Sequence, residues 1–334
     1  MRPDLADNHL GYASTQHPFR IGDRQPSSMS PWPILDFSMD NVIRKTTFLG
    51  GTHNRLTADV GGNPASAPVL LLHGGGQTRH SWRQTQLELI AAGFFVVSLD
   101  ARGHGDSEWI ANADYSSDAQ IQDIIAVAKA IGRPPALVGA SMGGMNALMA
   151  CGEHPGIASA LVLVDVTPRL EMGGVDRIRA FMHANLDGFS TLDDAADAVA
   201  AYNPARPRPR NPDGLRKNLR QHQDGRWYWH WDPRIFADDP RTKLHGLAQR
   251  MLTAAERLRL PALLVRGGES DVVGQEGVDE LRAHIPHLEY ADIAGAGHMI
   301  AGDRNDAFTN TVVGFLGRHL LPVRRDAMLQ PNAR

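Results

Sequence analysis

The sequence predicts an α/β fold in which helices cover both faces of a mostly parallel, doubly wound sheet. Short and almost wholly apolar runs occupy residues 69–72, 94–97, 136–138, 161–164 and 262–265. Runs of this length and composition are typical of strands buried on both faces. Helical patterns separate most of these runs, and strands that alternate with helices form parallel sheets.

The remaining elements follow in order along the chain. An antiparallel hairpin is expected at residues 46–48 and 56–60, and a last strand at residues 288–293. The helical patterns cover residues 81–92, 118–131, 142–153, 275–285 and 305–320. The alternation breaks between about residues 168 and 258, where helical patterns and proline-rich turns replace the buried runs. This break predicts a helical cap inserted between two strands, because such insertions often cover active sites.

These patterns divide the chain into a core with an insertion and two end segments. Residues 1–40 are rich in Pro, Ser, Asp and Gly without a clear period, which predicts an N-terminal arm. The core is expected at residues 41–167 and 259–322, with the cap at residues 168–258 between its two parts. Residues 323–334 are expected to form a C-terminal tail.

Composition restricts the partners and the cellular compartment. The 334 residues carry a formal net charge of −3 and a single cysteine, Cys151, so neither an intramolecular disulfide nor a cysteine-based metal site is expected. The charge lacks the basic footprint of nucleic-acid-binding proteins, and no apolar run approaches the roughly 20 residues of a membrane helix. The first residues lack the apolar segment of a secretory signal. We expect a cytoplasmic protein that binds a small molecule, with its oligomeric state open.

The first chemical motif lies at residues 139–143, which read Gly-Ala-Ser-Met-Gly. It follows a predicted strand and precedes a predicted helix, which is the context of a nucleophile elbow. Small residues on either side of the serine allow a strained backbone turn that projects the hydroxyl outward. The pattern therefore predicts Ser141 as a nucleophile. The alternative is a glycine-rich strand-to-helix turn with an incidental serine.

The second motif, His-Gly-Gly-Gly at residues 73–76, comes directly after a predicted strand. Acyl transfer builds negative charge on a carbonyl oxygen, and two backbone N–H groups can stabilise that charge. We expect the N–H groups of Gly75 and Met142 to form this oxyanion hole, with Gly74 also contacting the substrate. A phosphate-binding loop is the alternative, but the sequence lacks both common phosphate-loop motifs at this point.

A histidine and a carboxylate complete the expected set. His298 stands in Gly-Ala-Gly-His at residues 295–298, and a serine needs such a base to remove its proton. Asp271 ends Arg-Gly-Gly-Glu-Ser-Asp at residues 266–271, just beyond a predicted strand. We expect Asp271 to orient His298, since the order Ser, Asp, His is that of one known triad arrangement. Asp165 is the alternative acid, and Glu269 a more remote one.

Together these motifs resemble the α/β-hydrolase superfamily over residues 45–320 of the chain. The resemblance extends to residues 100–107, which are similar to the family's D-x-R-G-x-G-x-S turn and are expected to buttress the elbow. It implies a sheet of about eight strands. The combination of His73-Gly74 with Trp82 is similar to capped esterases, epoxide hydrolases, dehalogenases and cofactor-free haloperoxidases. Epoxide hydrolases and dehalogenases use an aspartate at the elbow, whereas Ser141 suits attack on a carbonyl carbon.

The predicted cap contains the densest aromatic cluster of the chain, at residues 227–231. Trp227, Trp229 and Trp231 are candidate walls of the substrate pocket, and Met299 is a further candidate beside the predicted base. Packing of the cap onto the core is an equally weighted explanation of the same rings.

Together, these motifs predict a serine hydrolase that cleaves a carboxylic ester or a related carbonyl substrate through an acyl-enzyme on Ser141. Neither a metal nor an organic cofactor is expected, because the sequence carries no recognisable metal-ligand spacing. Two alternatives keep the triad, namely a cofactor-free perhydrolase of the haloperoxidase type and a C–C bond hydrolase. A third is a non-catalytic ligand receptor of the same fold.

Overall fold

The computed structural model describes residues 43–204, 208, 210–237, 241–300 and 305–322. The expected arm at residues 1–40 and the tail at residues 323–334 lie outside this described part. Within the described ranges, no helix has the length and apolar character needed to cross a membrane.

An eight-stranded, mostly parallel sheet forms the centre of the fold, as predicted. Its strand order is β1-β2-β4-β3-β5-β6-β9-β10. β1 pairs antiparallel with β2, and β2 pairs antiparallel with β4, whereas the remaining neighbours are parallel. The strands are β1 (Arg44–Leu49), β2 (Arg55–Gly61), β3 (Pro68–Leu72), β4 (Phe95–Leu99), β5 (Ala136–Ala140), β6 (Ala160–Val164), β9 (Ala262–Gly267) and β10 (Glu289–Ile293).

The order of the central strands shows where the winding direction of the sheet reverses. The chain passes from β3 to β4 on one side and then returns to place β5 on the other side of β3. Where the winding direction reverses in this way, the loops after the two strands part, and α/β proteins bind ligands at the carboxyl ends there. The His-Gly-Gly-Gly loop follows β3 and Ser141 follows β5, so both motifs stand at this point.

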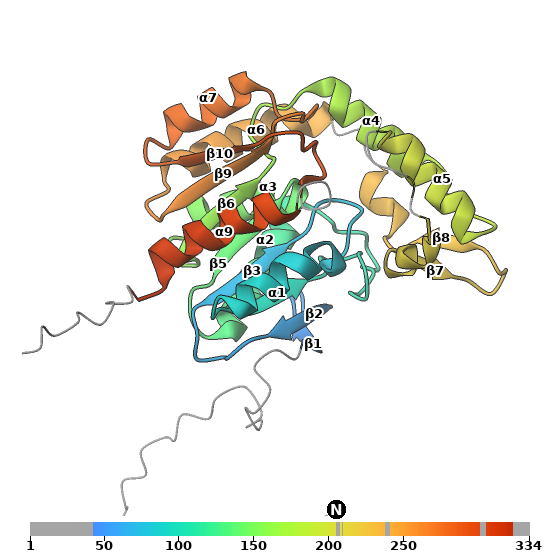
Figure 1. Ribbon diagram of the computed structural model, residues 1–334, viewed down its shortest axis with the longest axis horizontal. Helices are drawn as coiled ribbons and strands as arrows, with labels where there is room; N and C mark the ends of the chain where they lie inside the picture. Colours follow the sequence, from blue (N-terminus) through green and yellow to red (C-terminus); the bar gives the residue numbers. More distant parts are fainter. Residues whose placement is uncertain (1–42, 205–207, 209, 238–240, 301–304, 323–334) are drawn as a thin grey trace, which may run out of the picture. The chain divides into compact units, whose positions relative to one another are not determined.

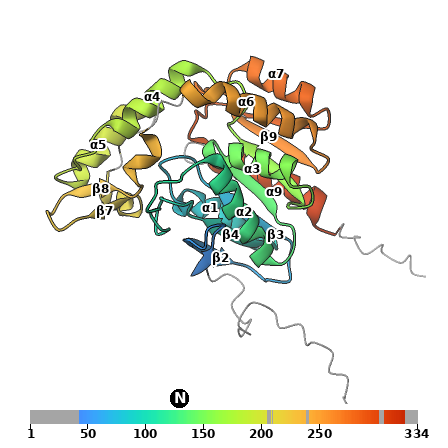
Figure 2. The same ribbon diagram turned by 180° about the vertical axis from the view of Figure 1, so that it is seen from behind.

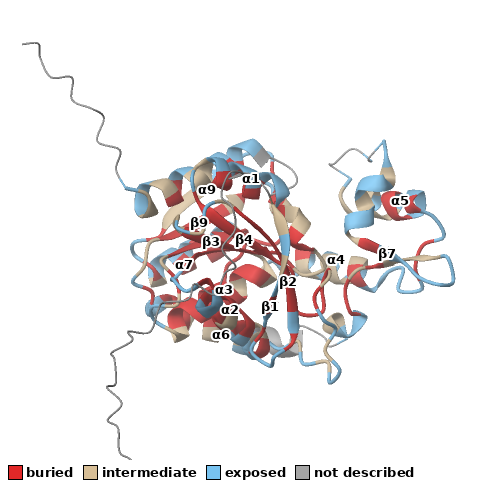
Figure 3. Cartoon of the chain, turned by 90° about the horizontal axis from the view of Figure 1, so that it is seen from below, coloured by how far each residue is buried: buried red, intermediate tan, exposed pale blue. Residues whose placement is uncertain are grey.

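Helices cover both faces of the sheet. α1 (Arg83–Ala91) packs against α9 (Asn305–Leu320), and Figure 1 shows this pair in front of the sheet. α3 (Met142–Glu153) contacts both α2 (Ser117–Ile131) and α6 (Arg241–Glu256), and Figure 2 shows these three on the other face. α7 (Gln275–His284) packs against α6. The strands β3, β4 and β6 are buried along their whole length, and Figure 3 shows β3 and β4 among the red ribbons at the centre.

The segment between β6 and α6, which we call the insertion, departs from the strand–helix alternation. It contains α4 (Met172–His183), α5 (Leu192–Tyr202), η2 (Pro212–Lys217), β7 (Leu219–Gln221), β8 (Trp227–Trp229) and η3 (Pro233–Phe236). β7 and β8 form an antiparallel hairpin that the sequence patterns did not predict. The insertion has its own apolar cluster, in which Phe189, Leu192, Trp229 and Trp231 are buried.

α6 does not belong with the expected cap, although the predicted boundary at residue 258 included it. A side chain on Gly152 of α3 would stand 2.3 Å from the carbonyl oxygen of Ala254 of α6, so the two helices are in close contact. Arg250 of α6 also donates hydrogen bonds of 2.6 and 2.8 Å to the Glu153 carboxylate of α3. The insertion therefore ends before Arg241, and α6 is a layer of the core.

Candidate active site

Ser141 stands at a strained turn between β5 and α3. Its backbone has φ 45° and ψ −115°, a conformation that residues other than glycine rarely adopt. The neighbouring glycines make the turn possible. A side chain on Gly139 would lie 2.5 Å from the carbonyl oxygen of Gly143, and one on Gly143 would lie 2.4 Å from that of Leu72. The elbow predicted from residues 139–143 is therefore present in the backbone.

His298 lies in the loop after β10, and its ring is held by Asp165. The His298 Nδ1 and the Asp165 Oδ2 are 2.7 Å apart, and both side chains are largely buried. With Nδ1 bonded to a carboxylate, the Nε2 of His298 is left to face a reacting group. Within the described residues, Nε2 makes no hydrogen bond to the Ser141 hydroxyl.

Asp165 follows β6 and is held in one orientation by its neighbours. Its backbone has φ 48°, and its side chain is only 1% exposed. Oδ1 accepts a hydrogen bond of 2.9 Å from the Gly267 N–H, and Oδ2 accepts one of 2.6 Å from the Ser270 hydroxyl. Together with His298, three donors surround this carboxylate. Such an arrangement fixes the imidazole of His298 as an orienting acid must.

The expectation that Asp271 holds His298 is wrong in this geometry. The Asp271 carboxylate instead forms an ion pair with Arg177 of α4, and it is 30% exposed. The loop after β9 does reach the histidine's partner, but through Gly267 and Ser270 rather than through Asp271. Glu269 is exposed, and its N–H donates to the Ala296 carbonyl oxygen in the histidine loop.

The two residues that carry the expected oxyanion donors lie close together. A side chain on Gly75 would stand 3.9 Å from the Met142 Sδ, so the glycine loop and the first turn of α3 are in contact. Within the described residues, neither the Gly75 N–H nor the Met142 N–H has a hydrogen-bond partner. Both donors are therefore available to an oxygen atom, as an oxyanion hole requires.

Gln77 connects the glycine loop to the histidine loop, and sequence reasoning missed it. Its Oε1 accepts from the Gly74 N–H at 3.2 Å, and its Nε2 donates to the Met299 Sδ at 3.1 Å. A side chain on Gly74 would lie 3.5 Å from the Ser141 Cβ. These contacts bring the glycine loop, the nucleophile turn and the residue after His298 together. No sequence motif singles out Gln77, since its partner Met299 is 222 residues away in the chain.

Trp231 is the predicted tryptophan that the structure places against the glycine loop. A side chain on Gly76 would lie 3.6 Å from the Trp231 ring, whereas Trp229 stacks on Trp231 within the apolar cluster of the insertion. Trp227 lies beneath the Arg216 guanidinium on the β7–β8 hairpin. Packing therefore accounts for Trp227 and Trp229, and the pocket role expected for them stays a prediction.

Two apolar side chains of the insertion that were not predicted also lie against the glycine loop. A side chain on Gly76 would collide with Met182 of α4, and one on Gly75 would stand 3.5 Å from the Phe236 ring of η3. The surface that faces the predicted oxyanion donors is thus apolar. The contacts of Met182 and Phe236 with the glycine loop could not be predicted from the sequence, because both residues are more than 100 positions away from that loop in the chain.

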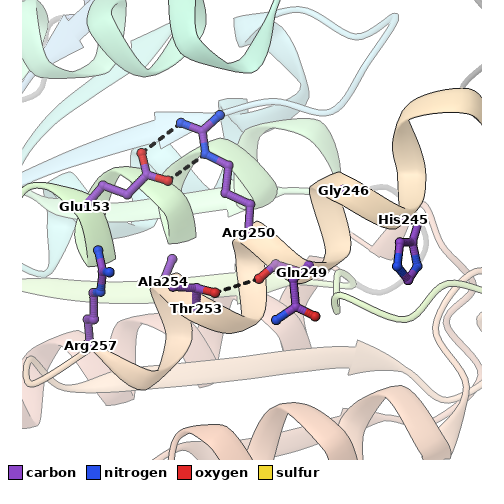
Figure 4. A pocket seen from close by; sticks show the side chains of 8 residues that line it. All are labelled: Glu153, His245, Gly246, Gln249, Arg250, Thr253, Ala254 and Arg257. Carbon is purple, nitrogen blue, oxygen red and sulfur yellow. Dashed lines mark hydrogen bonds and ion pairs between the residues drawn. The ribbon is translucent and has the colours of Figure 1, made fainter.

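A hollow of about 440 Å³ lies elsewhere, along α6 and the end of α3. Figure 4 shows its lining, in which the Arg250 guanidinium turns toward the Glu153 carboxylate. None of the predicted site residues lines it. Among the described residues, no group of three or more His, Cys, Asp or Glu side chains is arranged to hold a metal ion.

Comparisons with known proteins agree with this geometry. The family model described as alpha/beta hydrolase fold matches residues 67–304. An esterase of Mycobacterium tuberculosis is 31% identical over 262 residues, which cover 75% of this chain and 83% of that protein. A 3-hydroxybutyrate-oligomer hydrolase of Cupriavidus necator is 27% identical over 250 residues, which cover 71% of this chain and 84% of that protein.

A solved structure shares the fold at lower sequence identity. The crystal structure of E-2-(acetamidomethylene)succinate hydrolase aligns with a TM-score of 0.72 at 21% identity, covering 82% of this chain and 99% of that chain. The resemblance inferred from the motifs is thus confirmed. The chain belongs to the alpha/beta hydrolase fold family and is a hydrolase of that fold.

Proposed function

We propose that this protein is a serine hydrolase that cleaves carboxylic esters through an acyl-enzyme on Ser141. The observation that carries the proposal is the strained Ser141 turn at the same sheet edge as the buried His298–Asp165 pair. A strained backbone at this point costs roughly 1–3 kcal/mol, and such strain is concentrated at functional sites. The similarity to a protein named an esterase supports ester chemistry.

The proposed reaction proceeds in two halves. The His298 Nε2 accepts the Ser141 proton while the Ser141 oxygen bonds to the carbonyl carbon. The N–H groups of Gly75 and Met142 hold the oxyanion. The intermediate collapses when the bond to the alcohol oxygen breaks and His298 protonates that oxygen. Water then gives a proton to His298 while its oxygen attacks the acyl carbon. The bond between the acyl carbon and the Ser141 oxygen breaks, the acid is released, and His298 returns the proton to Ser141. Asp165 stabilises the imidazolium in both halves.

The side chains around the glycine loop favour a substrate with an apolar group. Met182, Phe236 and Trp231 all stand against Gly75 or Gly76, beside the proposed oxyanion donors. A substrate group that lies there exchanges water for apolar contacts, which contributes about 25 cal/mol per Å² of apolar surface buried. We therefore expect esters with an aliphatic or aromatic acyl group to be preferred over charged ones.

The test is hydrolysis of p-nitrophenyl esters from acetate to decanoate by the wild-type protein and by Ser141→Ala. We expect turnover in the wild type and a loss on the order of 10⁴–10⁶-fold in the variant, as for other serine nucleophiles. Ser159→Ala is the matched control, because Ser159 precedes β6 at the opposite edge of the sheet. It should leave the rate unchanged.

Two further outcomes separate the alternatives. Fluorophosphonate labelling of Ser141 without ester turnover would favour the same triad acting in perhydrolysis or on a C–C bond. Neither labelling nor turnover would contradict the proposal and favour a ligand receptor.

A further inference from the structure

Two buried histidines that pack against each other form hydrogen bonds to the backbone of the glycine loop. His73 begins this loop after β3, and His104 lies in the neighbouring loop after β4. Each side chain is about 1% exposed, and the ring centroids are 5.0 Å apart at an interplanar angle of 61°. Each ring bonds to the backbone of the other loop, so the two loops are cross-linked by reciprocal hydrogen bonds.

His73 fixes the peptide group that precedes Gly75. The His73 Nε2 accepts a hydrogen bond of 3.0 Å from the Ala101 N–H, so the ring proton is on Nδ1. Nδ1 then donates to the Gly74 carbonyl oxygen at 2.8 Å. In a trans peptide the carbonyl of one residue and the N–H of the next point in opposite directions. Holding the Gly74 carbonyl therefore directs the Gly75 N–H away from His73.

His104 fixes the peptide group that follows Gly75. Its Nε2 accepts a hydrogen bond of 3.1 Å from the Gly76 N–H. Its Nδ1 consequently carries the proton and donates to the Arg102 carbonyl at 3.1 Å. The two peptide groups on either side of the Gly75 Cα thus each bond to one imidazole, and the Gly74 carbonyl oxygen also accepts a hydrogen bond of 3.1 Å from the Gln77 N–H.

The glycine loop needs such restraint because residues 74–76 carry no side chains. Glycine adopts both signs of φ with little cost, so consecutive glycines can rotate a peptide group by a half turn. A rotated Gly74–Gly75 peptide would turn its N–H away from the substrate and present a carbonyl oxygen instead. Such a carbonyl would repel the oxyanion rather than stabilise it.

We propose that His73 and His104 are positioning residues that hold the Gly75 N–H in the orientation of an oxyanion donor. The inference rests on the proposed function, since it assumes that Gly75 serves the reaction of Ser141. Neither histidine touches the substrate. Each acts through the peptide group it bonds, and the two act with opposite polarity: His73 donates to the loop, and His104 accepts from it.

Burial keeps both rings in the state that this role needs. Desolvation lowers the pKa of His73 and lowers that of His104 to about 3, so both rings are neutral at neutral pH. The charged or titratable groups that also act on these pKa values are Asp100 and Arg79 for His73, and His230 and Asp232 for His104. A protonated His104 would have no lone pair on Nε2 and could not accept from Gly76.

The opposite polarity allows a crossed test with asparagine and glutamine. The asparagine amide overlays the Nδ1 side of an imidazole, and the glutamine amide overlays the Nε2 side. His73→Asn therefore retains a donor to Gly74, whereas His73→Gln loses it. His104→Gln retains an acceptor for Gly76, whereas His104→Asn loses it. All four variants exchange a buried imidazole for a buried amide, so general damage to packing is matched.

We expect kcat for p-nitrophenyl butyrate to fall about 10- to 100-fold in His73→Gln and His104→Asn, less than the 10²–10³-fold cost of deleting a donor. KM should change less than threefold, and His73→Asn and His104→Gln should keep kcat within about threefold. A trifluoromethyl ketone forms a hemiketal with a serine nucleophile, and the former carbonyl oxygen of the ketone becomes an oxyanion. Its affinity should weaken in parallel with kcat. His230→Asn is a control, since His230 lies beside the His104 loop and makes no hydrogen bond to the glycine loop within the described residues.

The proposal is overturned if all four variants lose thermal stability while kcat and ketone affinity stay unchanged, or if kcat falls equally in all four. Failure of the proposed function looks different, because the wild-type protein itself would then neither turn over the ester nor react with a fluorophosphonate. If the wild type is active but the donor-retaining and acceptor-retaining variants are no more active than the others, the positioning role of His73 and His104 is rejected while the proposed function stands.

Discussion

Two aspartates after neighbouring strands of the same sheet have opposite environments. Asp165, after β6, is 1% exposed and accepts hydrogen bonds from Gly267, Ser270 and His298. Asp271, after β9, is 30% exposed and pairs with Arg177. A carboxylate that is buried among three donors has one orientation, whereas an exposed ion pair exchanges readily with water. Burial and fixed donors therefore distinguish the orienting acid better than position along the chain.

The largest expected effect comes from exchanging each carboxylate for an amide. Asp165→Asn removes the charge that stabilises the His298 imidazolium and can invert the ring tautomer, so we expect kcat to fall on the order of 10³–10⁴-fold. Asp271→Asn should leave kcat within about threefold. Steady-state hydrolysis of p-nitrophenyl butyrate measures both. Equal losses in the two variants would remove the distinction drawn between the aspartates.

A second prediction concerns how the free energy of unfolding depends on pH through a buried group, His104. Burial lowers the pKa of His104 from 6.5 to about 3. As the pH falls below 6.5, the unfolded chain binds a proton at this residue that the folded chain does not. The stability contribution is therefore complete above pH 6.5 and is lost toward pH 3, at about 1.4 kcal/mol per pH unit.

Urea unfolding between pH 7 and pH 4 tests this expectation. His104→Gln should show a flatter dependence of the free energy of unfolding on pH than the wild type. Identical slopes would show that His104 takes up a proton in the folded state.

A smaller effect is expected from the hydroxyl that supports Asp165. Ser270 donates to the Asp165 carboxylate and accepts from the N–H groups of Val272 and Val273. Hydrogen bonds to charged groups contribute about 1.5–3 kcal/mol. Ser270→Ala should lower the free energy of unfolding by that amount and kcat by a few-fold. Ser159→Ala is the matched control, and a Ser270→Ala protein as stable as this control would argue against a firmly held Asp165.

The smallest effect is expected from the exposed pair. A double-mutant cycle with Arg177→Ala and Asp271→Ala should give a coupling of about 0–1 kcal/mol in the free energy of unfolding, because water and salt screen such pairs. Raising the salt concentration to about 1 M should reduce it further. A coupling that exceeded 2 kcal/mol and resisted salt would mean that Asp271 is as firmly held as Asp165.

The sequence predicted the fold and the nucleophile turn because both depend on local patterns. Buried parallel strands appear as apolar runs, and the Ser141 turn needs glycines at fixed spacing. The acid could not be assigned in this way. Asp165 and Asp271 both lie between Ser141 and His298 in the chain, so the order Ser, Asp, His fits either. Only the lateral packing of β6, β9 and the histidine loop decides between them.

Contacts across long stretches of chain account for the other differences. Gln77 meets Met299 across 222 residues, and no local pattern carries that information. His104 belongs to a loop expected to buttress the elbow, yet its ring bonds to Gly76 of the glycine loop. The β7–β8 hairpin has three residues in each strand, too few to show an alternating pattern.

The most direct test of the account is the rate at which a fluorophosphonate modifies Ser141, followed by intact-mass and peptide mass spectrometry. We predict a single adduct on the peptide that contains Ser141, formed rapidly in the wild type and in Asp271→Asn and far more slowly in Asp165→Asn. No adduct on Ser141, or equal labelling rates in the two aspartate variants, would contradict the claim that Asp165 and His298 activate this serine.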